Sequence, residues 1–499
     1  MRSVRFLLTL TLALALAPLA LAQTLAQTID TKAVDRIVQH TIEAWHIPGA
    51  AIAIVENDKL VYANGYGVRE LGKSDRVTTD TLFEIASTSK AFTTTSMAIL
   101  VDEKLMKFDD PVRQYLDYFH FTDPCADSLV TMRDIVSHRS GFAGHNELWD
   151  NTSFPREHII RAVGYLKVAK PIRTAYQYNN DMFMIAGEAA GAAAKMPFDT
   201  FRRTRIFDPL GMTSTLTSSA AFLASPNHAS GHQWSSKTQT ISVQPYENID
   251  NIGGAGDIKS NARDMAQWLR FQLADGVIDG KRIVSAEALN ETKAPQFALR
   301  TDPDVDLDTN IRSYAMGWNV QDYGGQLLVS HAGAINGFRT QVGLLPKQHA
   351  GVVVLLNAGR GLAGFAIRNE IADLILGHPA KDWDAVLLAA DKKADDKALA
   401  RQQERASKRL TDTHPSRDLL AYTGTYSHPA YGPVAVGLEN GALTLHWQRI
   451  NTPLTHWQFD TFSALDEAND LDEQVTFHLG EDGSVASFTL WGEEFGRTP

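Results

Sequence analysis

The alternation of hydrophobic and polar positions divides the chain into regions with different periodicity. Between about residue 30 and residue 380, short apolar runs such as 50–55 are mixed with longer apolar or amphipathic stretches such as 89–105 and 264–273. Short apolar runs are typical of buried strands, and the longer stretches are typical of helices. We therefore expect residues 30–380 to form a mixed α/β domain.

Two further patterns follow this domain. Residues 381–411 are rich in Lys, Asp, Ala and Arg, which predicts a solvated helical linker, with a disordered spacer as the alternative. In residues 412–499 apolar positions alternate with small or polar ones, and Asn440-Gly441 and Asp482-Gly483 supply turn residues. This alternation predicts half-buried strands and hence a small all-β domain.

The first residues have the pattern of an export signal. Arg2 and Arg5 precede an uncharged, mostly apolar run over residues 6–17, and Ala20-Leu21-Ala22 provides a small-x-small cleavage site. The run is shorter than the ~20 residues that a spanning helix requires. We therefore predict a signal peptide over residues 1–22 and a periplasmic or secreted mature protein without a stable membrane anchor.

Composition and charge restrict the partners. The chain has 499 residues and a formal net charge of -11, which disfavours nucleic acid as a partner. Its one cysteine, Cys125, allows no intramolecular disulfide. We expect a small-molecule or peptide substrate, and no motif in the sequence implies a metal or another cofactor.

The tetrad Ser87-Thr88-Ser89-Lys90 is the first candidate for chemistry. It precedes a long apolar stretch, so Ser87 is expected at the start of a helix. Residues three apart share one helix face, which brings the Lys90 amine toward the Ser87 hydroxyl. The lysine would then activate the serine as a nucleophile. The alternative is a helix-capping Ser87 with a solvated Lys90.

Two weaker motifs accompany the tetrad. Tyr178-Asn179-Asn180 provides a tyrosine that becomes a base only where a neighbouring cation favours its phenolate, and a buried structural tyrosine is the alternative. In the segment 331–334, Gly333 would let a substrate approach an edge strand closely, and the backbone N–H groups of Ala334 and Ser87 would form an oxyanion hole. The alternative for this segment is an ordinary hairpin.

The order S-x-x-K, Y-x-N and H-x-G resembles the serine β-lactamase and penicillin-binding protein family, in its class C β-lactamase, D-peptidase and esterase branch. The segments Ile47-Pro48-Gly49-Ala50-Ala51, 81–86, 136–141 and Gly253-Gly254-Ala255-Gly256 extend the resemblance over about 350 residues. It implies an α/β (α+β) three-layer fold with an antiparallel sheet and a helical subdomain. Residues 412–499 resemble a small lipocalin-like β-barrel, for which packing or contacts within a homo-oligomer are favoured over ligand binding.

The resemblance also implies roles for individual residues. Ser87 would be acylated, Lys90 and Tyr178 would transfer protons, and Asn180 would orient the substrate amide. His331 would line the far wall of the site, where β-lactamases carry a lysine that binds the substrate carboxylate. Because histidine is largely neutral at pH 7, the sequence favours uncharged substrates. Arg339 is a candidate substitute cation, with a solvent-facing strand arginine as the alternative.

Together these features predict an exported serine hydrolase that acts on peptides with D-amino acids, on esters or on amides. A β-lactamase or D-Ala-D-Ala carboxypeptidase is one alternative, and a non-hydrolytic penicillin-binding sensor is another. Residues 359–364 match G-x-G-x-x-G, but no strand ending in an acidic residue follows the predicted helix. A strand-to-helix turn is therefore favoured there over a dinucleotide site.

Overall fold

An eight-stranded antiparallel sheet forms the centre of the first domain in the computed structural model, which describes residues 29–150, 152–466, 469 and 471–498. The predicted signal peptide lies outside these described residues. The order of the strands across the sheet is β2 (Lys59–Gly67), β1 (Gly49–Glu56), β14 (Ala350–Leu356), β13 (Phe338–Leu345), β12 (Gln326–Ile335), β11 (Asn319–Tyr323), β10 (Arg312–Tyr314) and β9 (Phe297–Leu299).

Helices cover both faces of this sheet, as the sequence of β1 requires. Successive strand residues point to opposite faces, and every residue from position 49 to 55 is buried. One face packs against α1 (Thr31–Trp45) and α12 (Ala363–Leu376), and the other packs against α10 (Ala262–Leu273) and the helical region. The predicted three-layer α/β fold is therefore confirmed.

The helical region is built around α2 (Lys90–Asp102) and α6 (Asn180–Ala194), which pack against each other. Residues 90–100 of α2 are all buried, as expected for a helix with apolar or small residues on every side. The other helices are α3 (Pro124–Leu129), α4 (Met132–Val136), α5 (Arg156–Ala162), α7 (Phe198–Arg202), α8 (Asp208–Leu210), α9 (Ser219–Ala224) and α11 (Ala286–Glu291). Short strand pairs are β3 (Phe83–Glu84) with β6 (Lys259–Ser260), β4 (His232–Ser235) with β5 (Thr240–Val243), and β7 (Val277–Ile278) with β8 (Lys281–Arg282).

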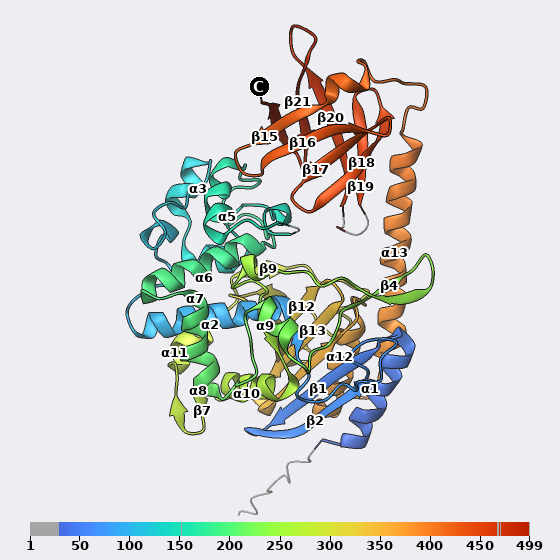
Figure 1. Cartoon of the computed structure of the whole chain (residues 1–499). Coiled ribbons are helices and arrows are strands. Elements are labelled where there is room, and N and C mark those ends of the chain that lie inside the picture. The colour runs from blue at the N-terminus through green and yellow to red at the C-terminus, as the bar shows by residue number, and fades with distance from the viewer. Residues whose placement is uncertain (1–28, 151, 467–468, 470, 499) are drawn as a thin grey trace, which may run out of the picture.

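A single long helix, α13 (Trp383–Ser407), connects this domain to a closed barrel (Figure 1). The barrel consists of β15 (Gly424–His428), β16 (Gly432–Glu439), β17 (Ala442–Trp447), β18 (Ile450–Gln458), β19 (Thr461–Asp466), β20 (Leu471–Leu479), β21 (Val485–Leu490) and β22 (Glu493–Arg497). Its interior is filled by aromatic rings that pack against one another, mostly edge-to-face or tilted, among them Tyr426, Phe477, Phe488 and Phe495. The predicted C-terminal β-barrel is confirmed.

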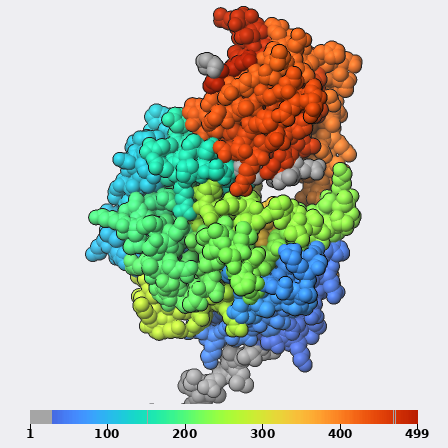
Figure 2. Space-filling view, viewed as in Figure 1, coloured from blue at the N-terminus to red at the C-terminus, as the bar shows by residue number. Residues whose placement is uncertain are grey.

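The barrel contacts the helical region of the first domain (Figure 2). The Tyr431 hydroxyl, in the loop between β15 and β16, lies 2.8 Å from Nδ1 of His145. Nε2 of His158, on α5, donates to the backbone oxygen of Ala430 at 2.9 Å. Among the described residues no helix combines the length and the apolar character needed to cross a bilayer.

Candidate active site

Ser87 lies in a 3₁₀ turn, Ala86–Ser89, that leads directly into α2. Ala86 before it has a positive φ of 46°, a conformation that costs energy for any residue except glycine and is often found at functional sites. The turn packs tightly against β12, since a Cβ on Gly333 would lie 2.2 Å from the backbone oxygen of Ile85. Gly333 therefore admits the turn that carries Ser87, and the close approach of a substrate to this strand stays a prediction.

Lys90 is fully buried and makes three contacts with oxygen atoms. Its Nζ lies 3.0 Å from Oγ of Ser87, 2.7 Å from Oδ1 of Asn180 and 3.1 Å from the backbone oxygen of Ala255. Burial lowers the pKa of Lys90 well below its usual range, because the charged form is poorly solvated there. No carboxylate among the described residues lies within ion-pairing distance of this amine.

The three contacts determine how a neutral Lys90 is oriented. A neutral amine has two N–H groups and one lone pair, and the oxygens of Asn180 and Ala255 can only accept. Both N–H groups are therefore used by these two acceptors. The lone pair is left facing Ser87, whose hydroxyl can donate to it.

Tyr178 completes a cluster with these two residues. Its hydroxyl hydrogen-bonds the Ser87 side chain, and Nζ of Lys90 lies 4.7 Å from the centre of its ring. The residue is 40% exposed, so it borders solvent, while its hydroxyl points to the desolvated interior. This desolvation raises the pKa of Tyr178, and the phenol stays protonated beside a neutral Lys90.

Asn180 is at the first position of α6, and its partner in the cluster is Lys90. The preceding residue, Asn179, caps the helix, since its Oδ1 accepts from the Met182 N–H at 2.9 Å. The Asn179 amide nitrogen also donates to the backbone oxygen of Ala143 at 2.8 Å. The helix start thus fixes the position of Asn180.

His331 is 3% exposed and lies in a chain of buried polar groups. Its Nε2 is 3.0 Å from the hydroxyl of Tyr314, and that hydroxyl is 3.2 Å from Nε2 of His138. Nδ1 of His331 is 2.6 Å from the backbone oxygen of Ala332, so both ring nitrogens are occupied. Burial, with a contribution from Lys90, lowers the pKa of His331 to about 3. The ring is therefore a neutral part of the wall, without a free nitrogen for a substrate.

Arg339 does not lie in the site, which corrects its sequence-based assignment to substrate binding. Its neighbour Thr340 donates to the Glu84 backbone on the Ser87 side of the sheet, so Arg339 points to the other face. There its guanidinium donates to the backbone oxygens of Ile335 and Phe338, at 2.9 and 2.7 Å. A cation on that face cannot meet a substrate carboxylate bound at Ser87.

Ala334 follows Gly333 on the same strand and pairs with Arg339 of β13. The pairing of β12 with β11 ends at Ser330, so residues 331–335 have one edge to which none of the described strands pairs. That edge adjoins the turn that carries Ser87. An unpaired edge of this kind is where a backbone N–H can bind a ligand, and the assignment of Ala334 to an oxyanion hole stays a prediction.

Sequence reasoning assigned no role to three residues that the site uses. The segment Gly253–Gly256 carries a family resemblance in the sequence, and the backbone oxygen of Ala255 binds Lys90. His138 lies in the similar segment 136–141, and no sequence motif includes Tyr314. Neither the contact of Tyr314 nor that of Ala255 has a signal in local periodicity, because both are made across the fold.

Comparisons with known proteins agree with this architecture. A family model described as Beta-lactamase matches residues 34–376, and a model described as a domain of unknown function (DUF3471) matches residues 408–496. The chain is 32% identical over 424 residues to an unguisins hydrolase of Aspergillus campestris, covering 80% of this chain and 76% of that protein. An unguisins hydrolase of Aspergillus violaceofuscus is 28% identical over 458 residues, covering 86% and 80% of the two chains.

Solved structures share the fold. The octameric penicillin-binding protein homologue from Pyrococcus abyssi superposes with a TM-score of 0.62 at 19% identity, covering 94% of this chain and 99% of that one. A class C β-lactamase from Rhodobacter sphaeroides superposes with a TM-score of 0.55 at 21% identity, covering 69% and 99%. Fold and site together define a serine hydrolase. The chain belongs to the β-lactamase family, and the predicted family membership is confirmed.

Proposed function

We propose that this protein is an exported hydrolase that forms an acyl-enzyme on Ser87 and acts on uncharged esters and on amide bonds of peptides, including those with D-amino acids. The observation that carries the proposal is the orientation of Lys90, whose two N–H groups are held by Asn180 and Ala255. Its lone pair is thereby held toward the Ser87 hydroxyl. Two relatives that are named hydrolases support a hydrolytic reaction.

This geometry supports the following first half of the reaction. Ser87 transfers its hydroxyl proton to Nζ of Lys90 while Oγ bonds to the substrate carbonyl carbon. The backbone N–H groups of Ser87 and Ala334 stabilise the resulting oxyanion. The protonated Tyr178 then donates its proton to the leaving group, the bond to the carbonyl carbon breaks, and Lys90 returns a proton to the phenolate.

The second half reverses these transfers with water. Water attacks the acyl carbon and passes a proton to Lys90, and a second oxyanion forms. Its collapse breaks the bond to Oγ, which takes the proton back from Lys90. The products are the carboxylic acid and the free enzyme, so protons and bonds balance over the cycle.

The site favours uncharged substrates over those with a free carboxylate. His331 is neutral and fully engaged, and Arg339 lies on the other face of the sheet. A charge-assisted hydrogen bond to a carboxylate contributes about 1.5 to 3 kcal/mol, which corresponds to roughly ten- to a hundred-fold in binding. A β-lactamase or D-Ala-D-Ala carboxypeptidase would lack this contribution from either residue.

The test is turnover by the purified chain from Gln23 onward. A chromogenic short-chain ester and a neutral D-peptide amide should be hydrolysed with multiple turnovers, and Ser87→Ala should abolish both activities. Mass spectrometry after exposure to a fluorophosphonate should show one adduct, on Ser87. Undiminished labelling of Ser87→Ala would refute Ser87 as the nucleophile, and acylation without turnover would favour the non-hydrolytic sensor.

Export and assembly have separate tests. The proposed signal peptide predicts that protein recovered from outside the cytoplasm begins at Gln23, which N-terminal sequencing measures. The Pyrococcus abyssi homologue is described as octameric. We propose that this chain also forms a homo-oligomer, and light scattering after size-exclusion chromatography measures the mass against the 54.9 kDa of the full chain.

A further inference from the structure

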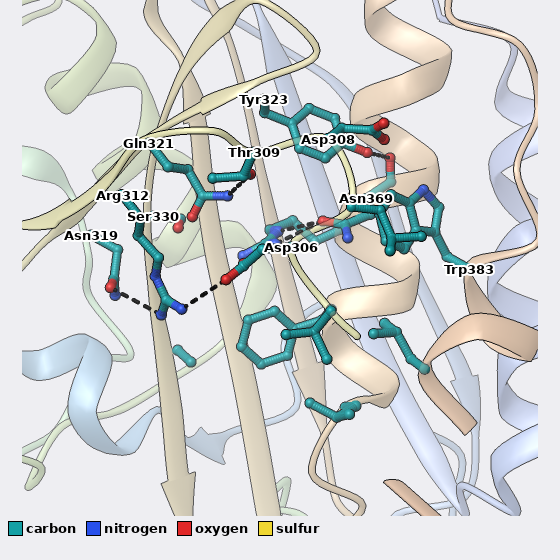
Figure 3. Close-up of a pocket in the computed structure, with 17 residues that line it drawn as sticks. Asp306, Asp308, Thr309, Arg312, Asn319, Gln321, Tyr323, Ser330, Asn369 and Trp383 are labelled. Carbon is teal, nitrogen blue, oxygen red and sulfur yellow. Dashed lines mark hydrogen bonds and ion pairs between the residues drawn. The ribbon is translucent and has the colours of Figure 1, made fainter. Parts of the chain in front are cut away.

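A cavity lies on the face of the sheet opposite Ser87, and Figure 3 shows the residues that line it. Its volume is about 240 Å³, and it is enclosed by β11, β12, α12, the start of α13 and the loop over residues 305–309. Ser330 and Ala332 of β12 line the cavity. His331, which lies between them in the strand, points to the opposite face and contacts Tyr314, whose hydroxyl also contacts His138. A ligand in this cavity would touch the strand that borders the Ser87 site without entering that site.

One wall of the cavity holds a buried cation without an acidic partner. Arg368 is 5% exposed, and its guanidinium donates to Oδ1 of Asn369 at 2.7 Å and to Oε1 of Gln341 at 3.3 Å. Both are neutral amide oxygens, and none of the carboxylates that the structure describes forms an ion pair with Arg368. Burial lowers the pKa of Arg368 to about 10, which reflects the cost of its unbalanced charge.

A second arginine is only partly satisfied. Arg312 pairs with Asp306 at 3.3 Å and donates to Oδ1 of Asn319 at 3.4 Å. Its Nε is buried and has no hydrogen-bond partner in the part of the chain that the structure describes. Arg312 lines the cavity, so this wall includes a residue with an unused guanidinium N–H among the described residues.

The other charged residues that line the cavity form ion pairs. Asp308 pairs with Lys381 at 2.5 Å, and Asp306 pairs with Arg312. Arg368 is thus the one charged residue of the described lining without an ion pair, which matches a monoanion better than a dianion. Guanidinium groups bind planar carboxylates with particular strength because two parallel N–H groups match the two oxygens.

Apolar side chains make up the rest of the lining: Leu362, Phe365, Trp383 and Leu387. An apolar cavity of about 150 Å³ holds a benzene ring, so about 240 Å³ leaves room for a ring or branched alkyl group with a short carboxylate arm. From these charges and walls, we propose that the cavity is a binding site for a small carboxylate with an apolar body.

The loop over residues 305–309 covers one side of the cavity. Leu307 at its tip is 45% exposed. The ion pair of Asp308 with Lys381, just before α13, holds the loop, and the preceding Asp304 forms an exposed ion pair with Lys393 of α13, at 2.6 Å. The loop is also held by the Gly324 N–H, which donates to the backbone oxygen of Asp308 at 2.9 Å, and by Nε2 of Gln321, which donates to Oγ1 of Thr309 at 2.9 Å.

The experiment uses phenylacetate as the probe and phenylacetamide as its uncharged match. Binding is measured by isothermal titration calorimetry to the full mature chain after a fluorophosphonate has blocked the serine nucleophile, or to Ser87→Ala. This removes the other site from the measurement, so the result is independent of the proposed hydrolytic function. We expect one phenylacetate per chain and at least tenfold weaker binding of the amide, since only the carboxylate meets the guanidinium charge.

Three variants locate the binding. Arg312→Gln removes one guanidinium and should weaken phenylacetate binding at least tenfold. Leu362→Trp fills the cavity from its apolar side and should abolish binding. Arg360→Gln is the matched control and should bind as the unmodified chain does, because Arg360 pairs with Asp391 on the same face but does not line the cavity.

The outcomes separate clearly. The proposal is overturned when the blocked chain binds no phenylacetate, when it binds acid and amide equally, or when Leu362→Trp and Arg312→Gln bind unchanged. Ester hydrolysis by the unblocked variants shows that each one is folded. Should Arg312→Gln fail to fold, Leu362→Trp alone still distinguishes a filled cavity from an open one.

Discussion

The Tyr314 hydroxyl lies 3.0 Å from Nε2 of His331, and this contact fixes the direction of a whole chain of hydrogen bonds. At one end the backbone N–H of Asn179 donates to Nδ1 of His138 at 3.1 Å. At the other end Nδ1 of His331 meets the backbone oxygen of Ala332, which can only accept. His138 must therefore donate from Nε2 to Tyr314, and Tyr314 must donate to His331.

This direction predicts single, opposite tautomers for the two histidines. His138 should carry its proton on Nε2 and His331 on Nδ1, because either cation would place two donors against each other. Burial lowers the pKa of both rings, to about 3 for His331. Nitrogen-15 NMR of the imidazoles should show these neutral tautomers from pH 8 to pH 5. A charged ring at pH 6 would contradict the proposed directions.

The lowered pKa of His331 predicts that the folded protein loses stability in acid. Below pH 6.5 the unfolded chain binds a proton at position 331, whereas folded His331 does not bind one until about pH 3. Stability is therefore present above pH 6.5 and is lost as the pH falls, by about 2 kcal/mol at pH 5 for this residue. His331→Asn should show a smaller decrease in Tm between pH 7 and pH 5. The exposed His349→Asn should behave as the parent, and equal decreases in both variants would contradict the prediction.

If Lys90 acts as a neutral base, catalysis depends on its ability to accept a proton and not on a positive charge at this position. Lys90→Arg keeps a cation at the site but cannot accept a proton, so kcat should fall by ~10²- to 10⁴-fold with little change in KM. In the parent, kcat/KM should fall as the pH decreases through the lowered pKa of Lys90. The surface variant Lys73→Arg is the matched control. A Lys90→Arg enzyme with near-normal kcat would assign Lys90 to positioning alone.

The local part of the site follows from the sequence, and the long-range part does not. Ser87 and Lys90 are three residues apart, so helical geometry alone predicts their contact. Strand alternation decides on which face Arg339 lies, but the sequence does not show which face the helical region covers. The burial of His331 likewise depends on Tyr314, a residue 17 positions away that no motif connects to it.

The fold class was predictable because it too depends on local sequence patterns. Apolar runs, the charged linker and the period-two alternation after residue 412 are properties of short segments, and each segment forms the predicted kind of element. Arg339 was a misleading candidate because a cation close in sequence to Gly333 resembles a substrate ligand.

The neutral His331 also bears on substrate choice. Since this ring stays neutral, kcat/KM for anionic substrates should not improve as the pH falls from 7 to 5.5.

Asp181 predicts a variant that stabilises the protein. Its side chain is fully buried, Oδ1 has no hydrogen-bond partner among the described residues, and Oδ2 accepts only a long bond from the His145 N–H, at 3.4 Å. Burial raises its pKa to about 7. The unfolded chain is ionised above about pH 3.8, so this residue costs stability increasingly as the pH rises from about 4 to about 7.

The corresponding test is Asp181→Asn, which removes the ionisation without changing the shape of the side chain. Its Tm should exceed that of the parent at pH 8, by the equivalent of about 2 to 4 kcal/mol, and the difference should shrink toward pH 4. Asp117→Asn, an exposed match, should change little at either pH. A gain that is equal at pH 4 and pH 8 would show that ionisation of Asp181 is not the cause.

Tyr431 of the barrel predicts an energetic connection between the two domains. Its buried hydroxyl forms a hydrogen bond with Nδ1 of His145, and the backbone N–H of His145 donates to Asp181. Asp181 follows Asn180, whose side chain binds Lys90. Tyr431→Phe leaves the His145 nitrogen without this partner, which costs about 1 to 3 kcal/mol of stability. The loop that contains His145 adjoins the start of α6, where Asn180 lies. For this reason kcat/KM of Tyr431→Phe for a neutral ester should fall by a few-fold.

Tyr426→Phe is the matched control for this connection, since its hydroxyl donates to the Tyr422 backbone within the barrel. It should lower the barrel's stability and leave kcat/KM unchanged. A double-mutant cycle of Tyr431→Phe with His145→Phe, followed by thermal unfolding and ester kinetics, should give a coupling of about 0.5 to 3 kcal/mol, the range for residues in contact. Additive effects on Tm, with identical kinetics in Tyr431→Phe and Tyr426→Phe, would show that the barrel is attached to the hydrolase domain without influencing its site.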